Sequence, residues 1–225
     1  GGGGWCCRCS AHPRPAFTIA CAAGICQDLG GTLSEGLVEF TNRETWTLIH
    51  GLILGTFFLL AFAGGLAGLW SLRTEYVTPV GITERVRRLK LGTAAMAVVA
   101  WATVITGTWV VYPWYRESLA GEEGVGCEGM QVPGDECSPR DFLLSNVSGN
   151  TEDWHKFGME WKEHIAWLSP MLATVAAFLA IYYGATMAQN RYVRLLVTAI
   201  FIGAFVTAGI ARLYGALITK VAPVT

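Results

Sequence analysis

The sequence predicts an all-α membrane protein in which four transmembrane helices form two hairpins. Only 15% of the 225 residues are charged and 52% are hydrophobic, whereas a soluble domain carries about 25% charged residues. Four apolar stretches reach the roughly 20 residues that a helix needs to cross a bilayer. The net charge is −1, so no basic surface indicates a nucleic-acid partner.

The four spans are expected at about 45–70, 89–112, 161–187 and 192–214, which together define a bundle over residues 45–215. Charged residues and histidines are few within them and lie near the ends; they include His50, Lys90, Lys162, Glu163, His164 and Arg212. Such interiors are typical of helices that face lipid or one another rather than water.

The charge of the connections predicts the orientation. Residues 71–90 hold five Lys and Arg against two Glu, whereas the long connection 113–160 is acidic. Cytoplasmic loops carry the excess of Lys and Arg, so we expect the acidic loop outside the cell. With four spans, both termini then lie outside as well. The expected location is the cytoplasmic membrane of a bacterium.

Residues 1–44 are expected to form a cysteine-rich outer extension, and residues 216–225 a short outer tail. The extension holds Cys6, Cys7, Cys9, Cys21 and Cys26. Because five is an odd number, at least one thiol is free, lipidated or paired with another chain. A metal site at Cys6, Cys9 and His12 is an alternative to a structural disulfide or to disorder.

Two further cysteines, Cys127 and Cys137, flank a Gly- and Pro-containing stretch of the acidic loop. Disulfides form and persist outside the cytoplasm. The sequence therefore predicts a Cys127–Cys137 disulfide that closes part of this loop.

Two histidines at matching depths are the main functional indication. His50 lies about a turn into the first span, and His164 opens the third. An ionisable residue inside a membrane segment is costly and marks a functional site by default. Because two imidazoles can supply both axial ligands of a haem iron, we expect one b-type haem near the outer face, bound by His50 and His164. Interfacial hydrogen bonding and another metal remain alternatives.

Several neighbours fit such a haem. Gly51 and Gly55 in the first span would leave room for a flat macrocycle, although close helix packing explains this spacing too. Arg212, Arg116 and Tyr112 lie at a level where they could bind the haem propionates. The alternative for Arg212 is a side chain that extends along the helix to reach the membrane surface.

Glu160 and His164 are four residues apart and share one helix face. A carboxylate on the second imidazole nitrogen would fix the tautomer of a ligating histidine, and Glu160 could act in this way. The alternative is that Glu160 and Glu163 favour the positive end of the helix. His155 lies nine residues before His164, so the two would point to opposite sides of a continuous helix.

The four spans and the placement of the histidines resemble the membrane-anchor b cytochromes of respiratory and photosynthetic complexes. The resemblance implies an electron-transfer subunit, rather than a stand-alone enzyme, that passes electrons between a quinol or membrane partner and an outer redox protein. Its expected partners are other subunits of a membrane redox complex and an outer electron carrier, with a quinone as a further candidate.

Two other functions stay open. One is a cofactor-free structural or assembly subunit of a larger membrane complex. The other is a quinone-linked thiol-disulfide oxidoreductase, which also places cysteines outside a four-helix bundle. The chain departs from that group because no Cys-x-x-Cys adjoins a span.

Overall fold

The computed structural model describes residues 40–72, 81–117, 127, 129–131, 133, 137–145 and 149–223. The chain divides into two units, residues 1–39 and 40–225. The first unit lies outside the described residues, and with it the expectations for Cys6, Cys7, Cys9, His12, Cys21 and Cys26.

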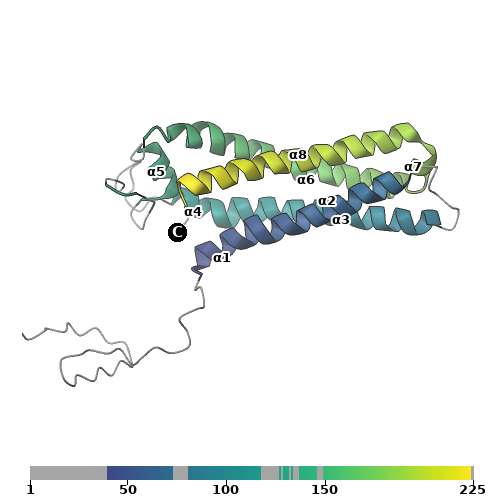
Figure 1. The fold of residues 1–225 in the computed structure, drawn as a ribbon, viewed down its shortest axis with the longest axis horizontal. Coiled ribbons are helices and arrows are strands. Elements are labelled where there is room, and N and C mark those ends of the chain that lie inside the picture. The colour runs from purple at the N-terminus through teal and green to yellow at the C-terminus, as the bar shows by residue number, and fades with distance from the viewer. Residues whose placement is uncertain are drawn as a thin grey trace, which may run out of the picture. The chain divides into compact units, whose positions relative to one another are not determined.

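Four long helical segments make up this unit (Figure 1): Asn42–Ser71, Gly81–Arg116, Trp154–Tyr183 and Arg191–Val221. Each is long and apolar enough to cross a membrane, which confirms the four predicted spans. The part of the chain that the structure describes contains no β-strand. The protein therefore has the composition and architecture of an integral membrane protein built from helices.

Within these segments, short π-helical pieces (η) alternate with α-helix. In chain order the elements are α1 (Asn42–Leu48), η1 (Ile49–Ile53), α2 (Leu54–Ser71), α3 (Gly81–Thr106), η3 (Gly107–Val111), α4 (Tyr112–Arg116), α5 (Pro139–Leu144), η4 (Trp154–Met159), α6 (Glu160–Tyr183), α7 (Thr186–Gln189) and α8 (Arg191–Val221).

Local capping explains where the first and last spans begin. The Thr41 hydroxyl accepts a hydrogen bond from the Glu44 amide at 3.1 Å, and the Glu44 carboxylate accepts one from the Thr41 amide at 2.8 Å. This reciprocal pair satisfies amides that a helix start leaves free, so the first helix begins at Asn42, three residues before the expected start. Asn190 caps α8 through the Tyr192 and Val193 amides.

The third span ends earlier than predicted. α6 stops at Tyr183 because Gly184 adopts a positive φ of 46°, a conformation that glycine accepts without steric cost. The expected boundary at Met187 instead falls in the separate short helix α7. α8 continues to Val221, so most of the expected tail is helical.

The hairpins pack through small residues and phenylalanines. A Cβ placed on Gly92 of α3 would lie 2.9 Å from the Gly65 nitrogen of α2, so these backbones approach as closely as glycine allows. Between α2 and α8, the rings of Phe62 and Phe205 stack with centroids 4.0 Å apart. The bundle interior is mainly apolar, and the buried Ser169 hydroxyl adds a hydrogen bond from α6 to the Ala204 carbonyl of α8 at 2.9 Å.

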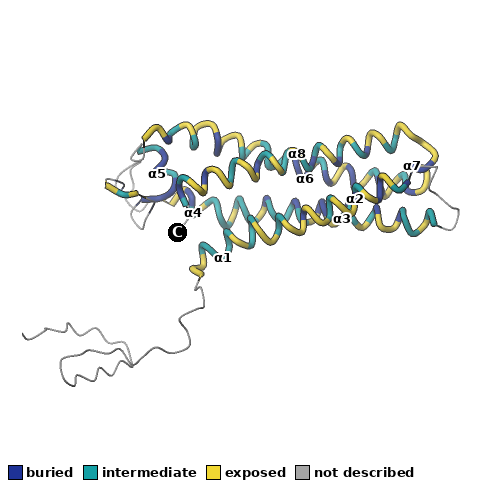
Figure 2. The backbone as a smooth tube through the Cα atoms, in the orientation of Figure 1, coloured by how far each residue is buried: buried dark blue, intermediate teal, exposed yellow. Residues whose placement is uncertain are grey.

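The outward sides of the helices carry large apolar side chains. Exposed positions recur along all four long helices in Figure 2, and they include Leu60, Val98 and Phe178. Water would disfavour so much exposed apolar surface, whereas lipid accepts it.

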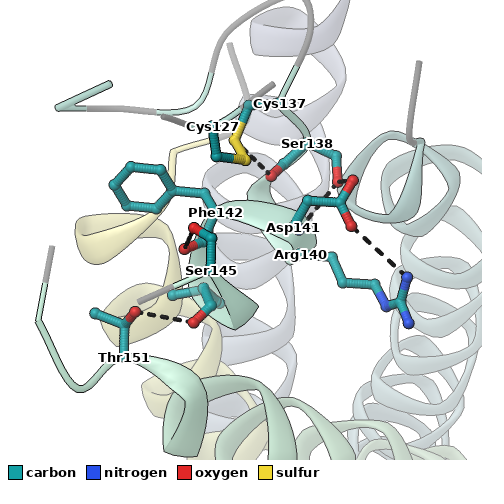
Figure 3. The surroundings of a disulfide bond; sticks show 9 residues. Cys127, Cys137, Ser138, Arg140, Asp141, Phe142, Ser145 and Thr151 are labelled. Atoms are coloured by element: carbon teal, nitrogen blue, oxygen red, sulfur yellow. Dashed lines mark hydrogen bonds and ion pairs between the residues drawn. A yellow bond between two sulfur atoms is a disulfide. The ribbon is translucent and has the colours of Figure 1, made fainter. Parts of the chain in front are cut away.

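We call the end of the bundle that carries α4, α5 and η4 the loop end, and the end that carries α7 the basic end (Figure 1). At the loop end, Cys127 and Cys137 form the predicted disulfide, with their Cα atoms 5.0 Å apart (Figure 3). Both cysteines are fully buried in a second apolar cluster with Tyr115 and Phe142. The described part of the acidic loop is thus a packed cap.

The cap is held by its own short helix. Ser138 begins α5 by accepting a hydrogen bond from the Asp141 amide, and its hydroxyl donates to the Asp141 carboxylate at 2.8 Å. Farther along, the Thr151 hydroxyl donates to the Leu143 carbonyl at 2.9 Å (Figure 3). These contacts connect the segment before η4 to the disulfide.

Candidate functional site

His50 lies half-buried in η1 and contacts the second span. Its Nδ1 is 3.1 Å from the Thr106 hydroxyl oxygen. That hydroxyl has a single proton, which it already donates to the Ala102 and Thr103 carbonyls at 2.8 and 3.1 Å. Because these carbonyls are available for the hydroxyl proton, we assign Thr106 as the acceptor and place the proton of the neutral imidazole on Nδ1. The lone pair on Nε2 is the one available to a metal.

Gly107, at the start of η3, makes room for this imidazole. A Cβ at Gly107 would lie 2.7 Å from His50 Cε1 and 3.3 Å from Nε2, so any larger residue would displace the ring. Gly107 is not among the site residues expected from the sequence. The available signal was that Gly107 is a glycine of the second span at the level of His50. That correspondence can be recognised only once the two helices are aligned.

His164 occupies the opposite kind of environment. Its side chain is exposed on α6, and its Nδ1 is 2.7 Å from the Glu160 backbone carbonyl. A carbonyl oxygen only accepts, so Nδ1 again carries the proton and Nε2 the lone pair. The expectation that the Glu160 carboxylate would hold this histidine is corrected, because the contact is made by the main chain one turn earlier.

The two imidazoles lie at the same end of the bundle but on different sides. Lys162, two residues before His164, lies against α8, because a Cβ at Gly215 of α8 would lie 3.2 Å from its Cε. Residues two apart on a helix point about 200° from each other, so His164 faces away from this interior side. Among the described residues, no hydrogen bond or ring contact joins His50 to His164.

The structure brings the predicted Arg212 and Gly55 together. A Cβ at Gly55 would lie 2.7 Å from the guanidinium carbon of Arg212, so the glycine lets this cation pass from α8 onto α2. At Gly51 a Cβ would meet nothing within 4 Å. The first span thus has open space beside His50 and a cation one turn deeper.

Tyr112 and Arg116 are also neighbours, with the Arg116 guanidinium 5.7 Å from the Tyr112 ring centroid. Tyr112 stacks on Tyr115 at 6.0 Å between centroids. The Tyr115 hydroxyl lies 2.7 Å from His155 Nδ1. His155 is therefore engaged in the cap, apart from His50 and His164.

Glu163 is a site residue whose role the sequence did not indicate. Its Oε1 is buried and has no hydrogen-bond partner among the described residues. The carboxylate acts electrostatically on both Tyr112 and Lys162. A buried carboxylate is costly unless it is paired, so Glu163 and Lys162 together make the interior of the loop end polar.

Among the described residues, three π-helical segments, η1, η3 and η4, occur at the loop end. π-helical turns are rare and frequently mark functional sites. Each of these segments contains one of the residues described above: His50 in η1, Gly107 in η3 and His155 in η4.

Within the residues that the structure describes, no three His, Cys, Asp or Glu side chains converge on a metal position. A b-type haem needs only two protein ligands, so this finding does not bear on it. The chain matches no protein-family model, no curated protein and no solved structure.

Proposed function

We propose that this chain is a membrane electron-transfer subunit that binds one b-type haem at the loop end through His50 and His164. It would pass electrons between a quinol or membrane partner and an outer redox protein, within a larger redox complex. The main support for the proposal is that the two imidazoles have the same assigned tautomer. Both lie at the loop end, and in both Nδ1 lies within hydrogen-bond distance of an oxygen, so that we assign the proton to Nδ1 and the lone pair to Nε2.

A histidine that binds a metal through Nε2 needs this tautomer, with the proton on Nδ1. A ligating histidine almost always donates its other ring N–H to an oxygen acceptor, which fixes the tautomer and raises the basicity of the coordinating nitrogen. The Thr106 hydroxyl would serve His50 in this way, and the Glu160 carbonyl would serve His164. When bound, haem supplies one-electron transfer.

The cations near His50 suit the propionates of a haem. Arg212 lies against Gly55 of α2, and Lys162 lies against Gly215 of α8 at the same end of the bundle. Their charges would bind the propionates and favour the reduced iron over the oxidised iron. Thr106 and Gly107 would position His50 and keep its proton on Nδ1.

The proposal requires His164 to approach His50. Its exposed position means that the first turns of α6 must rotate about the helix axis, or that the ligand set spans two chains. η4 ends directly before α6, and π-helical turns are where a helix changes its register. The stoichiometry of haem to protein separates these two arrangements.

We further propose that the loop end and both termini lie outside the cytoplasm of a bacterium, with the basic end inside. The excess of Lys and Arg at the basic end supports this orientation. The disulfide of the loop end supports it too, since such bonds persist in oxidising compartments.

The direct test is a reduced-minus-oxidised visible spectrum of the detergent-purified protein, with pyridine extraction to count haem. A sharp α-band of b type at about one haem per chain is the expected result. One haem for two chains would assign the site to an interface between copies. A colourless preparation with blank metal analysis would contradict the proposal.

A second candidate function, a cofactor-free assembly subunit, is favoured by one observation. His164 shares its exposed side of α6 with Trp161, Leu168 and Met171, a mainly apolar surface with one polar side chain that fits a partner helix. The thiol-disulfide alternative gains no comparable support, because Cys127 and Cys137 are both 0% exposed.

A further inference from the structure

A groove of about 620 Å³ runs between α2 and α3 toward the basic end. Its walls include Leu60, Gly64 and Gly68 of α2 and Gly92 of α3, and its end is formed by Arg85 and Arg88. The groove lies on the surface that a four-span bundle turns toward lipid. It is therefore accessible to a membrane lipid without entry into the protein core.

Helix packing explains only part of the small-residue lining. A Cβ at Gly68 would lie 3.2 Å from the Leu89 backbone, and one at Gly92 would lie 2.9 Å from the Gly65 nitrogen. Both glycines are thus needed for close approach of the helices. Gly64 differs, because a Cβ there would meet nothing within 4 Å. The space at Gly64 belongs to the groove, since Gly64 is one of its lining residues.

The groove ends at positive charge. The Arg85 guanidinium donates to the Ser71 carbonyl at 2.6 Å, which anchors it beside the end of α2. Glu84 is paired with both Arg87 and Arg88, at 2.9 and 2.8 Å. Residues 84–88 contain three arginines and one glutamate, so the net charge of this turn stays positive after that pairing.

We propose that this groove binds an anionic phospholipid, with one acyl chain along Gly64 and the phosphate between Arg85 and Arg88. Basic pockets between transmembrane helices bind anionic headgroups, and the apolar trough adjoining this one selects a lipid over a free phosphate. A zwitterionic headgroup would bring its own cation to the same arginines. The inference is independent of the haem proposal, because no residue of the groove belongs to the loop end.

The test is native mass spectrometry of the full chain in detergent, titrated with phosphatidylglycerol or with phosphatidylcholine of the same acyl chains. We expect phosphatidylglycerol to bind about tenfold more tightly. Gly64→Leu should fill the trough and weaken its binding, whereas Gly64→Ala, which meets nothing, should change it little. Arg88→Gln should reduce the preference for phosphatidylglycerol without disturbing the anchored Arg85.

The matched control is Arg87→Gln, which also breaks a pair with Glu84 but lies outside the groove. Glycerol phosphate, added alone, should not displace the lipid. Equal affinities for the two lipids would overturn the proposal, as would unchanged phosphatidylglycerol binding by Gly64→Leu. Displacement by glycerol phosphate would show that the arginines bind a phosphate without the chain, and would overturn it as well.

Discussion

The hydroxyl of Thr106 determines which nitrogen of His50 carries the proton. The Ala102 and Thr103 carbonyls of α3 are both placed to take its own proton, so we assign it as the acceptor for the imidazole. The sequence shows where the histidines are, but not which ring nitrogen of each one carries the proton. The candidate ligands could therefore be predicted from it, but their protonation required the second helix to be in place.

Thr106→Val should weaken haem binding by about tenfold, since loss of a hydrogen-bonding partner of a ligand typically costs 10- to 100-fold in metal affinity. The measurement is haem retained per chain during dilution in detergent. Thr103→Val is the matched control, because the Thr103 hydroxyl donates to the Val99 carbonyl and not to the imidazole. Equal haem retention by the two variants would remove Thr106 from the site.

Gly107→Ala should destabilise the protein by about 1–3 kcal/mol, the usual cost of overpacking. The added Cβ would stand 2.7 Å from His50 Cε1, so the imidazole must move from Thr106. Thermal unfolding in detergent measures the loss. Gly51→Ala is the control, because its Cβ meets nothing and alanine is the better helix former. A Gly107→Ala variant as stable as Gly51→Ala would show that the ring is not confined by the glycine.

At the scale of the elements, the four spans could be predicted because length and apolar content decide them. The ends depended on short-range chemistry that is also visible in the sequence: a Thr41–Glu44 capping box at the first helix and Gly184 at the end of the third. The π-helical segments could not be predicted. They arise where one helix adjusts to its neighbours, and no local residue preference specifies them.

The loop end has its own stabilising bond. The disulfide joins cysteines ten residues apart and is buried with Tyr115 and Phe142. Cys127→Ser/Cys137→Ser should lower the local stability of the cap by about 2–4 kcal/mol. Hydrogen exchange in residues 137–153 should rise, while the four spans stay protected. Unchanged exchange in this cap would show that the apolar cluster suffices without the bond.

At the scale of the whole molecule, the sequence predicts how the spans follow one another but not how each is rotated. α6 turns Ser169, Ala173, Ala176 and Ala180 toward the bundle, a spacing of three and four residues that marks one helix face. His164 is five residues before Ser169 and lies off that face. This small-residue stripe was the available signal that His164 and His50 do not face each other in the described arrangement.

The proposed orientation gives a prediction for intact cells. In a variant whose five N-terminal cysteines are serine, a cysteine at the exposed Asn150 should react with a membrane-impermeant maleimide. A cysteine at the exposed Thr186 in α7 should react only after the membrane is opened, because the basic end is cytoplasmic. The reverse pattern would invert the topology and place the candidate haem at the cytoplasmic face.

The central claim is that His50 and His164 share one iron, and haem content in single variants tests it most directly. His50→Ala and His164→Ala should each lose most of the haem, because either change leaves the iron with one protein ligand. His155→Ala, whose imidazole is held by Tyr115, should keep the wild-type spectrum and amount. Full haem in both the His50 and His164 variants, or loss only in His155→Ala, would contradict the account.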